Sequence, residues 1–390
     1  MAYDRRGQFL LNGSKDKDVG IFVNTPAQVH FFRNIVRELE KRGRATHIVA
    51  RDYGETVPLL EEMGIDHFLY STPSSSKAGK VTSIPSDVIK ATRWLKRFDI
   101  GLITGFGSYD TYASTLMGLP NLIFNDSEFT ISTLYYILEF KLVMPFVDHI
   151  ITPSYFRQDL GRKQLRVNSL KEMAYLHPSY YTPDEGVLDL LSVSKDEPYS
   201  ILRFNAFDAI HDKGVWGFDD DSKRELVKRL EEHSRVFISS EKGVPPELRS
   251  NVINIPRYRI HDALSYARLL VTDTQTMATE SAILGTPTVR CNSFVGPTDM
   301  GNFIELEEKY GLIVNLSDRG RAIDRAVELV QDKGAKVEWK RKRSRLLDDY
   351  VDITALMVWL IEDYPRNMER LIADPETVSG FRFKSPRPLI

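Results

Sequence analysis

Short runs dominated by apolar residues alternate with longer amphipathic stretches along most of this chain. Residues 19–23, 100–104 and 269–272 are such runs, and they have the length and composition of buried strands in a parallel sheet. The stretches between them repeat apolar side chains at helical spacing, as in residues 29–39, and often end at a glycine. Strands that alternate with helices predict an α/β fold of parallel sheets with helices on both faces.

Two such strand–helix series follow each other and meet near residues 178–198. Two parallel-sheet domains that face each other would bring the carboxyl ends of their strands to one cleft, where open α/β sheets bind ligands. Residues 341–361 are expected to form a long final helix. We expect the following division: a first domain over 18–178, a second over 196–345, a helical segment over 346–372, and flexible tails at 1–17 and 374–390.

Composition narrows the classes of function. The 52 Lys and Arg residues against 54 Asp and Glu residues give a net charge of −2, so the chain lacks the basic character of a nucleic-acid-binding protein. The single cysteine, Cys291, excludes an internal disulfide framework and fits a reducing compartment. The N-terminus lacks a signal-peptide core, and the apolar run 353–361 is too short to span a bilayer. We therefore expect a cytoplasmic protein without a transmembrane segment.

The stretch 269–290 carries the clearest chemical signal. An apolar run ends at Asp273 and Thr274, a helix-forming segment follows, and Gly285 with Pro287 stops it. A helix that begins directly after a buried strand aims backbone N–H groups and its dipole at an anion, of which a phosphate is the natural example. Glu280 lies one turn inside this helix, and its carboxylate is suited to accept hydrogen bonds from the vicinal hydroxyls of a ribose. The alternative is that Asp273 and Thr274 merely cap the helix and Glu280 is a solvated residue.

Further candidates follow other expected strands. His30 lies in the first turn of a helix for which Thr25, Pro26 and Gln28 predict a capping box. Gly107 belongs to a Gly-x-Gly turn that lacks the third glycine of the dinucleotide fingerprint.

Asp126 and Glu128 follow the strand at 121–125, where two carboxylates can act as general acid or base, hold hydroxyls, or simply form a turn. Arg203 and Asn205 end the strand at 199–203, and His211 lies in the loop beyond it.

Residues 129–146 are rich in aromatic and aliphatic side chains. They predict an ordinary buried helix, or alternatively a surface that meets an apolar acceptor or a membrane.

Three motifs resemble those of a known family. Residues 24–32, residues 171–178, and residues 276–280 with 284–287 resemble the signatures of the prokaryotic family called domain of unknown function 354, over roughly residues 18–372. The layout also resembles the GT-B fold of sugar-nucleotide-dependent glycosyltransferases and of the non-hydrolysing UDP-N-acetylglucosamine 2-epimerases. This resemblance implies two Rossmann-like domains facing across a cleft, with the C-terminal helix crossing back onto the first domain.

In these epimerases an Asp-Ser-Gly-Gly turn precedes a Glu, seven residues after the Asp, that holds the uridine ribose. Asp273, Thr274 and Glu280 fit that spacing, but Gln275 and Thr276 replace the glycine pair.

Other epimerase features are missing. The epimerases carry a His just before an Arg at the start of the second domain, whereas Leu202 precedes Arg203 here and His211 lies eight residues further on. Their His-Gly-Asp turn is also absent, with Gly107 and Ser108 near its position. These departures count against epimerase chemistry more than against a nucleotide-sugar site.

The resemblance implies a GT-B glycosyltransferase that uses a nucleotide sugar, UDP-linked, without a required metal or other cofactor. Arg203 and the helix after Asp273 would hold the diphosphate and Glu280 the ribose. The other expected donor-site residues are Asn205, Thr274, Thr276 and Gly107. His30, Asp126 or Glu128 would deprotonate an acceptor hydroxyl, with His211 as a further catalytic candidate.

Two alternatives stay open. One is a nucleotide-sugar epimerase or hydrolase, and the other is a non-catalytic sugar-nucleotide binder. The acceptor is expected to be lipid-linked or a polysaccharide, which would suit peripheral attachment to a membrane, and a homodimer is among the open assembly states. A dehydrogenase is disfavoured because no complete Gly-x-Gly-x-x-Gly follows the first strand.

Overall fold

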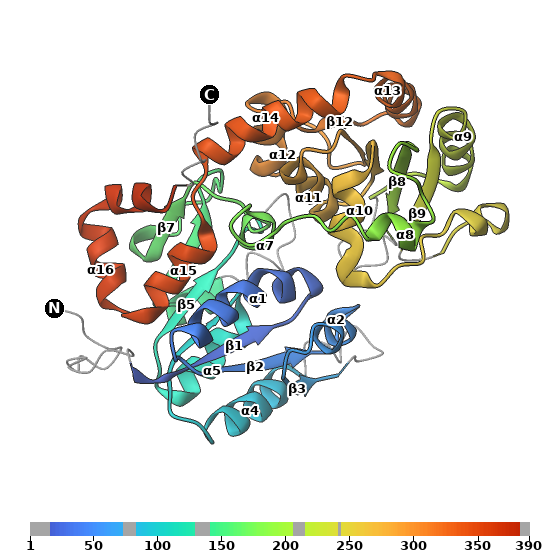
Figure 1. Ribbon diagram of the computed structural model, residues 1–390. Helices are drawn as coiled ribbons and strands as arrows, with labels where there is room; N and C mark the ends of the chain where they lie inside the picture. The colour runs from blue at the N-terminus through green and yellow to red at the C-terminus, as the bar shows by residue number, and fades with distance from the viewer. Residues whose placement is uncertain (1–15, 73–82, 129–140, 206–214, 241–242, 383–390) are drawn as a thin grey trace. The chain divides into compact units, whose positions relative to one another are not determined.

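The computed structural model describes residues 16–72, 83–128, 141–205, 215–240 and 243–382 (Figure 1). The chain divides into two compact units. Unit 1 joins the residues up to Tyr175 with those from Asp349 onward, and unit 2 comprises Leu176–Asp348. Each unit is built around one parallel sheet.

Unit 1 contains a seven-stranded sheet in the order β3-β2-β1-β4-β5-β6-β7, and every neighbouring pair is parallel. Its strands are β1 (Asp18–Val23), β2 (Thr46–Arg51), β3 (Phe68–Ser71), β4 (Ile100–Gly105), β5 (Asn121–Phe124), β6 (His149–Pro153) and β7 (Gln164–Val167). Every residue of β4 is buried, as the composition of a central parallel strand requires.

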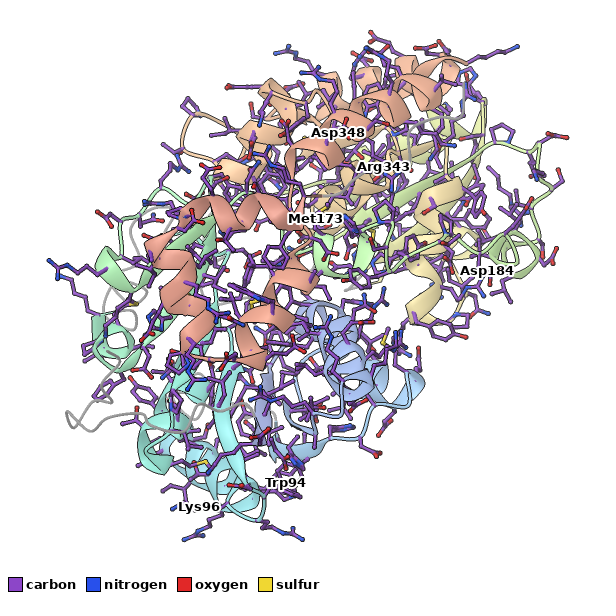
Figure 2. The ribbon with its side chains drawn as sticks, turned by 60° about the vertical axis from the view of Figure 1, so that its left-hand side comes forward. Trp94, Lys96, Met173, Asp184, Arg343 and Asp348 are labelled. Carbon is purple, nitrogen blue, oxygen red and sulfur yellow. The ribbon has the colours of Figure 1, made fainter. Side chains whose placement is uncertain are left out.

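The helices of unit 1 are α1 (Pro26–Lys41), α2 (Thr56–Glu62), α4 (Ile84–Leu95), α5 (Ser108–Met117), α15 (Ile353–Glu362) and α16 (Arg366–Ala373), and α7 (Met173–Leu176) lies at the boundary of the units. Short 3-10 turns are η2 (Met144–Phe146), η3 (Gly161–Lys163) and η6 (Pro375–Phe381). Trp94 of α4 stacks on Phe68 of β3 with ring centroids 4.9 Å apart, so this helix packs against the sheet edge (Figure 2).

Unit 2 contains a five-stranded parallel sheet in the order β12-β11-β10-β8-β9. Its strands are β8 (Tyr199–Phe204), β9 (Arg235–Ser240), β10 (Leu269–Thr272), β11 (Thr288–Cys291) and β12 (Val314–Leu316). Its helices are α8 (Val187–Leu191), α9 (Asp220–Glu231), α10 (Ile260–Tyr266), α11 (Thr276–Leu284), α12 (Gly301–Glu308), α13 (Arg319–Gln331) and α14 (Ala335–Asp349), with 3-10 turns η4 (Pro246–Asn251) and η5 (Arg257–Arg259).

The strand order reverses once in each sheet. The reversal lies between β1 and β4 in unit 1 and between β8 and β10 in unit 2. Ligands of open α/β sheets bind beyond the carboxyl ends of the strands at such a switch point. The predicted α/β class with parallel sheets is therefore confirmed. Each sheet has one switch point, at the carboxyl ends of its strands, that suits a ligand.

Three local expectations are corrected. Thr25 is the N-cap residue of α1 but its side chain makes no capping bond, and Gln28 Oε1 accepts instead from Asn24 N at 2.7 Å. The single helix expected over 341–361 is interrupted between α14 and α15, where Val351 N donates to Asn168 O and Asp352 caps α15.

The expected tail from residue 374 begins with η6, and Asp352 N donates to Phe381 O at 2.8 Å. The contact with Asp352 ties this segment to unit 1.

Most of the apolar stretch 129–146 lies outside the described residues. Its last part forms η2, whose Phe146 ring meets Tyr112 of α5 edge-on. Among the helices that the structure describes, none combines the length and the apolar character needed to cross a bilayer.

Candidate functional site

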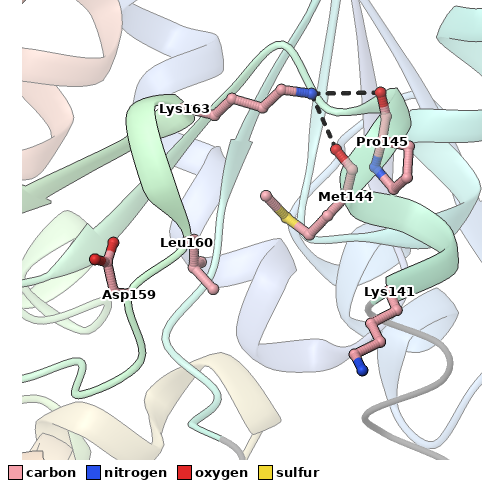
Figure 3. Close-up of a pocket in the computed structure, with 6 residues that line it drawn as sticks. All are labelled: Lys141, Met144, Pro145, Asp159, Leu160 and Lys163. Carbon is pink, nitrogen blue, oxygen red and sulfur yellow. Dashed lines mark hydrogen bonds between the residues drawn. The ribbon is translucent and has the colours of Figure 1, made fainter.

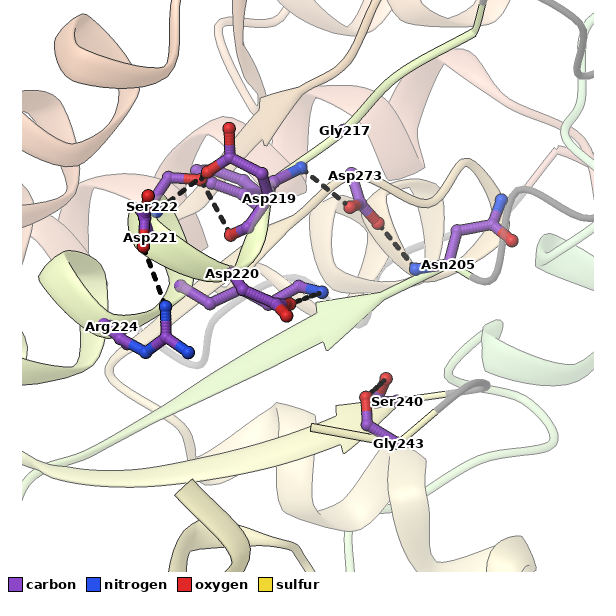
Figure 4. A network of polar contacts seen from close by, with 12 residues as sticks. Asn205, Gly217, Asp219, Asp220, Asp221, Ser222, Arg224, Ser240, Gly243 and Asp273 are labelled. Atoms are coloured by element: carbon purple, nitrogen blue, oxygen red, sulfur yellow. Dashed lines mark hydrogen bonds and ion pairs between the residues drawn. The ribbon is translucent and has the colours of Figure 1, made fainter. Parts of the chain in front are cut away.

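Asp273 occupies the switch point of unit 2, directly after β10 (Figure 4). Its side chain is buried, with 2% of the residue exposed. Oδ1 accepts from Asn205 N at 2.7 Å and Oδ2 accepts from Phe218 N at 3.1 Å. The carboxylate therefore bridges the end of β8 and the segment that leads into α9.

The expectation that Asp273 and Thr274 cap the helix is wrong. The N-cap residue of α11 is Gln275, which makes no side-chain capping bond. Thr274 Oγ1 lies 2.7 Å from Thr272 Oγ1, and Thr274 N donates to the same hydroxyl at 2.9 Å. Both side chains of the turn thus have partners outside α11, and the first N–H groups of α11 are left to other acceptors.

Burial raises the pKa of Asp273 to about 6, although the amides of Asn205 and Phe218 oppose the shift. Gly217 lies so close that a Cβ there would collide with the Asp273 carboxylate. Glycine is therefore required for this carboxylate to reach its two backbone partners.

Arg203, the residue after Leu202 in β8, lies beside the same switch point. Its Nη1 donates to Ser239 Oγ on β9 at 2.9 Å. Arg203 and Asn205 thus stand at the carboxyl end of β8, as predicted, and Thr276 begins α11 beyond the neighbouring β10.

Glu280 faces a buried histidine that sequence reasoning missed. Glu280 is 5% exposed, and its Oε1 lies 3.0 Å from Nε2 of His261, which is 1% exposed. His261 belongs to α10 and is 19 residues away in sequence. No local pattern signals this pair, because α10 and α11 meet only when the chain has folded.

His30 lies on α1 and is buried against Tyr175. The two rings stack with centroids 5.1 Å apart, and His30 Nδ1 is 3.3 Å from Arg33 Nη1. Arg33 Nη2 donates to Tyr175 O, and Asn34 Nδ2 donates to Ala174 O. The motifs at 24–32 and 171–178 therefore contact each other within unit 1.

Asp126 and Glu128 each pair with a separate cation. Lys171 Nζ lies 2.7 Å from Asp126 Oδ2 and 3.4 Å from Glu172 Oε1. Burial opposes the charged form of Lys171, but the two carboxylates outweigh it and raise the pKa of the amine. Arg157 donates to Glu128 Oε1 from its backbone N at 2.7 Å and from Nε at 3.2 Å.

Gly107 is the N-cap residue of α5 in the turn after β4, and its backbone contacts a second buried aspartate. Gly107 N donates to Asp110 Oδ1 at 3.0 Å, and Asp110 is completely buried. Burial raises the pKa of Asp110 to about 7. A Cβ at Gly105 would lie 2.6 Å from Asp110 Cγ, so this glycine too makes room for a carboxylate. The acid three residues after Gly107 is the pattern that would have revealed Asp110 in the sequence.

The predicted residues thus fall into two groups. In unit 2, the predicted residues lie at the end of β8, directly after β8 or β10, or in the first turns of α11: Arg203, Asn205, Asp273, Thr274, Thr276 and Glu280. In unit 1, His30, Gly107, Asp126 and Glu128 follow the carboxyl ends of β1, β4 and β5. His211 lies outside the described residues. Across the described ranges, no group of three or more His, Cys, Asp or Glu side chains is gathered closely enough to hold a metal ion.

A pocket of about 420 Å³ lies elsewhere in unit 1 (Figure 3). Lys163 Nζ donates there to Met144 O at 3.1 Å and to Pro145 O at 3.3 Å. The lining residues are Lys141, Met144, Pro145, Asp159, Leu160 and Lys163. These segments precede β6 and β7, so the pocket lies at the amino ends of strands and is separate from the candidate site.

Solved structures with this fold include epimerases and glycosyltransferases. The UDP-GlcNAc 2-epimerase from Methanocaldococcus jannaschii matches with a TM-score of 0.58 and 14% identity, over 84% of this chain and 99% of the other. The S. aureus MnaA–UDP co-structure matches with a TM-score of 0.63 and 13% identity, over 90% and 97%. MurG of Acinetobacter baumannii matches with a TM-score of 0.53 and 14% identity, over 88% and 99%. These likenesses confirm the predicted GT-B-like fold class.

Sequence comparison gives the family. A curated protein of Methanocaldococcus jannaschii, the uncharacterized protein MJ0665, is 25% identical over 288 residues, which are 70% of this chain and 81% of that protein. The family model described as "Protein of unknown function (DUF354)" matches residues 18–363. The chain therefore belongs to the DUF354 family.

Proposed function

We propose that this protein binds a nucleotide sugar, UDP-linked, at the carboxyl edge of the five-stranded sheet and transfers the sugar to an acceptor. The observation that carries the proposal is the buried Glu280, which lies on α11, the helix that starts at the switch point of unit 2. His261 of α10 contacts its carboxylate. A carboxylate in this position suits the two hydroxyls of a ribose. The S. aureus MnaA neighbour was solved with UDP, which supports UDP as the nucleotide.

The first turn of α11 supplies the proposed diphosphate site. Its opening N–H groups lack intrahelical acceptors and carry the positive end of the helix dipole. Arg203 at the end of β8 adds a fixed positive charge beside this turn. Such donors stabilise the charge that develops on a departing nucleoside diphosphate when a glycosidic bond breaks.

Unit 1 supplies the proposed acceptor chemistry. We propose His30 as the general base, because its imidazole lies in the first turns of α1, beyond the carboxyl end of β1, whereas Asp126 and Glu128 form ion pairs with Lys171 and Arg157. We propose that these two carboxylates orient acceptor hydroxyls.

An epimerase is the second candidate, because several structural neighbours, among them two with TM-scores of 0.58 and 0.60, are described as UDP-N-acetylglucosamine 2-epimerases or as putative ones. Incubation of the protein with a nucleotide sugar distinguishes a transferase, a hydrolase, an epimerase and a non-catalytic binder. A transferase releases UDP only with an acceptor, a hydrolase releases it without one, a non-hydrolysing epimerase changes the sugar while it stays linked, and a non-catalytic binder does none of these.

The first test is a thermal-shift series with UDP, GDP, CDP, UDP-sugars and NAD on the wild type and on Glu280→Ala. A ligand at 100 times its Kd adds about 2.7 kcal/mol to the stability of the state that binds it. We expect UDP to raise the melting temperature of the wild type and to lose this effect in Glu280→Ala.

Glu328→Ala, which removes an exposed carboxylate of α13, is the matched control and should respond to UDP as the wild type does. If no nucleotide shifts the wild-type melt, the proposed function is wrong.

A further inference from the structure

We propose that Arg51 is an acceptor-binding residue, and that the acceptor carries an oxyanion, a phosphate or a carboxylate, which the Arg51 guanidinium group binds. The inference rests on the proposed function and names the chemical class of the acceptor that unit 1 receives. It comes from an arginine that ends β2 at the carboxyl edge of the seven-stranded sheet and is held by two tyrosine rings.

Arg51 lies beside the switch point of unit 1. Strand β2 pairs with β1, whose last residue Val23 is in register with Ala50, so Arg51 stands one residue further toward the carboxyl edge. Asp52 N donates to Ser71 O of β3 at 2.9 Å, which fixes the backbone directly after Arg51. Ligands of open α/β sheets bind at this edge, so the side chain of Arg51 is placed where an acceptor can bind.

Two aromatic rings hold the guanidinium group. Its Cζ lies 5.5 Å from the ring centroid of Tyr53 and 5.6 Å from that of Tyr109. Tyr109 packs on Tyr70, with ring centroids 5.5 Å apart, and Tyr70 Oη donates to Asn24 Oδ1 at 2.5 Å. Contact with the face of a ring restricts an arginine side chain but supplies no oxygen acceptor to its N–H groups. The donors are therefore preorganised, which lowers the entropy cost of binding a ligand.

The guanidinium group of Arg51 has no oxygen partner in the part of the chain that the structure describes. Other arginines of unit 1 bind oxygen atoms: Arg44 Nη1 donates to Ile361 O at 2.6 Å, and Arg157 Nε donates to Glu128 Oε1 at 3.2 Å. Arg51 is half-buried and meets the two tyrosine rings instead. Its N–H donors are therefore available to a ligand.

The carboxylates near this edge bind other groups. Asp87 Oδ2 accepts from Ser71 Oγ at 2.7 Å, and the completely buried Asp110 accepts from a backbone amide of its own turn at 3.0 Å. Asp52, the residue after Arg51, forms no ion pair with it. An arginine presents five N–H donors in a rigid fork that matches a phosphate or a carboxylate, so an oxyanion is the ligand that fits this site.

The test measures the binding of inorganic phosphate and of acetate to the full chain by NMR at constant ionic strength, with and without saturating UDP. The signals are the Nε–H of Arg51, identified by its absence from the spectrum of Arg51→Gln, and the backbone amides of residues 51–54. We expect at least one of the two anions to shift these signals saturably while UDP occupies the proposed donor site. The anion that binds more tightly identifies the acceptor group as a phosphate or a carboxylate.

Three variants test the role of the arginine. Arg51→Gln removes the charge and the fork, and we expect it to raise the Kd of the anion at least about tenfold, the effect of losing a charge-assisted hydrogen bond. Arg51→Lys keeps a positive charge without the fork, so its Kd should rise less. Arg93→Gln, at an exposed position in the last turn of α4, is the matched control and should bind the anion as the wild type does. The Kd of UDP should stay within about twofold in all three variants, because the proposed nucleotide site belongs to unit 2.

An anion Kd that is unchanged in Arg51→Gln, or the lack of a saturable shift with either anion, overturns the acceptor role of Arg51 while the proposed function stands. Displacement of the anion by UDP, or weaker UDP binding in Arg51→Gln, also overturns this role, because Arg51 would then belong to the donor site. A wild type that does not bind UDP overturns the proposed function itself, and the UDP titration shows this independently of the anion.

Discussion

Each unit buries one aspartate beside its switch point, and in each a glycine makes room for the carboxylate. Asp110 accepts from Gly107 N in unit 1, and Asp273 accepts from Asn205 N and Phe218 N in unit 2. Both carboxylates bind backbone amides of the turns that border the strand ends. We interpret both as residues that shape the candidate sites through the backbone.

The pKa of Asp110 makes stability depend on pH. Its folded value of about 7 lies above the ordinary value of 3.8, so the folded state binds more protons between these limits. This contribution to the free energy of unfolding is therefore present at low pH and is lost as pH rises through about 7. Asp110→Asn removes this titration. We predict that its free energy of unfolding, relative to that of the wild type, rises by at least about 1 kcal/mol when the pH is raised from 5 to 8.

Urea denaturation at both pH values measures this difference. Asp273, whose pKa is raised to about 6, contributes in the same direction but is unchanged in the variant. Asp66→Asn, at an exposed position of unit 1, is the control and should track the wild type. A difference between Asp110→Asn and the wild type that stays constant with pH would contradict the prediction.

At the scale of elements, α11 is the helix that the candidate site depends on. All its residues from Ala278 to Leu284 are buried. Its carboxyl end meets a guanidinium group of α14, because Arg343 Nε donates to Ile283 O. Positive charge at the carboxyl end of a helix interacts favourably with the helix dipole. The helix is therefore fixed at its far end, while its amino end opens toward the switch point.

The break between α14 and α15 depends on Asp352. Its Oδ1 accepts from Ala355 N at 2.9 Å, which caps the first turn of α15. Helix α15 packs on α1 in unit 1, and Thr354 Oγ1 donates to Ala174 O. We predict that Asp352→Ala lowers the free energy of unfolding by about 1 kcal/mol, the usual effect of losing an N-cap side chain. Asp352→Asn keeps an acceptor and should cost less, and equal losses in both variants would argue against the capping role.

At the scale of the whole molecule, the chain enters unit 2 at Leu176 and returns to unit 1 at Asp349. The residues proposed to hold the nucleotide belong to unit 2, and those proposed for acceptor chemistry belong to unit 1. Binding of the nucleotide alone should therefore leave a signature that is confined to one unit.

We predict that UDP slows amide hydrogen exchange in the full chain at residues 203–205 and 273–280. A nucleotide at 100 times its Kd adds about 2.7 kcal/mol to the free energy of any local opening of the structure that releases the nucleotide. Exchange at these residues should therefore slow by up to about 100-fold. The β1–α1 turn of unit 1 serves as the internal comparison. Protection confined to that turn would contradict the assignment of the nucleotide site to unit 2.

The sequence by itself determined the features that depend on local patterns. Buried strands of parallel sheets need apolar runs, and helices need apolar residues at helical spacing, so the α/β class and the strand ends were predictable. The positions of Arg203, Asp273 and Glu280 near the ends of β8 and β10 followed from the same reading. One local interpretation failed between 341 and 361, because Val351 and Asp352 find their partners at Asn168 and Phe381.

Only the tertiary structure decided what these side chains contact. Glu280 meets His261, Asp273 meets the amides of Asn205 and Phe218, and Asp126 meets Lys171, which lies 45 residues away. Each partner belongs to another segment of the chain and is brought near only when the chain folds. Local spacing therefore predicted where a carboxylate lies along its own element, whereas the burial and pairing that set its chemistry arose from contacts between elements distant in sequence.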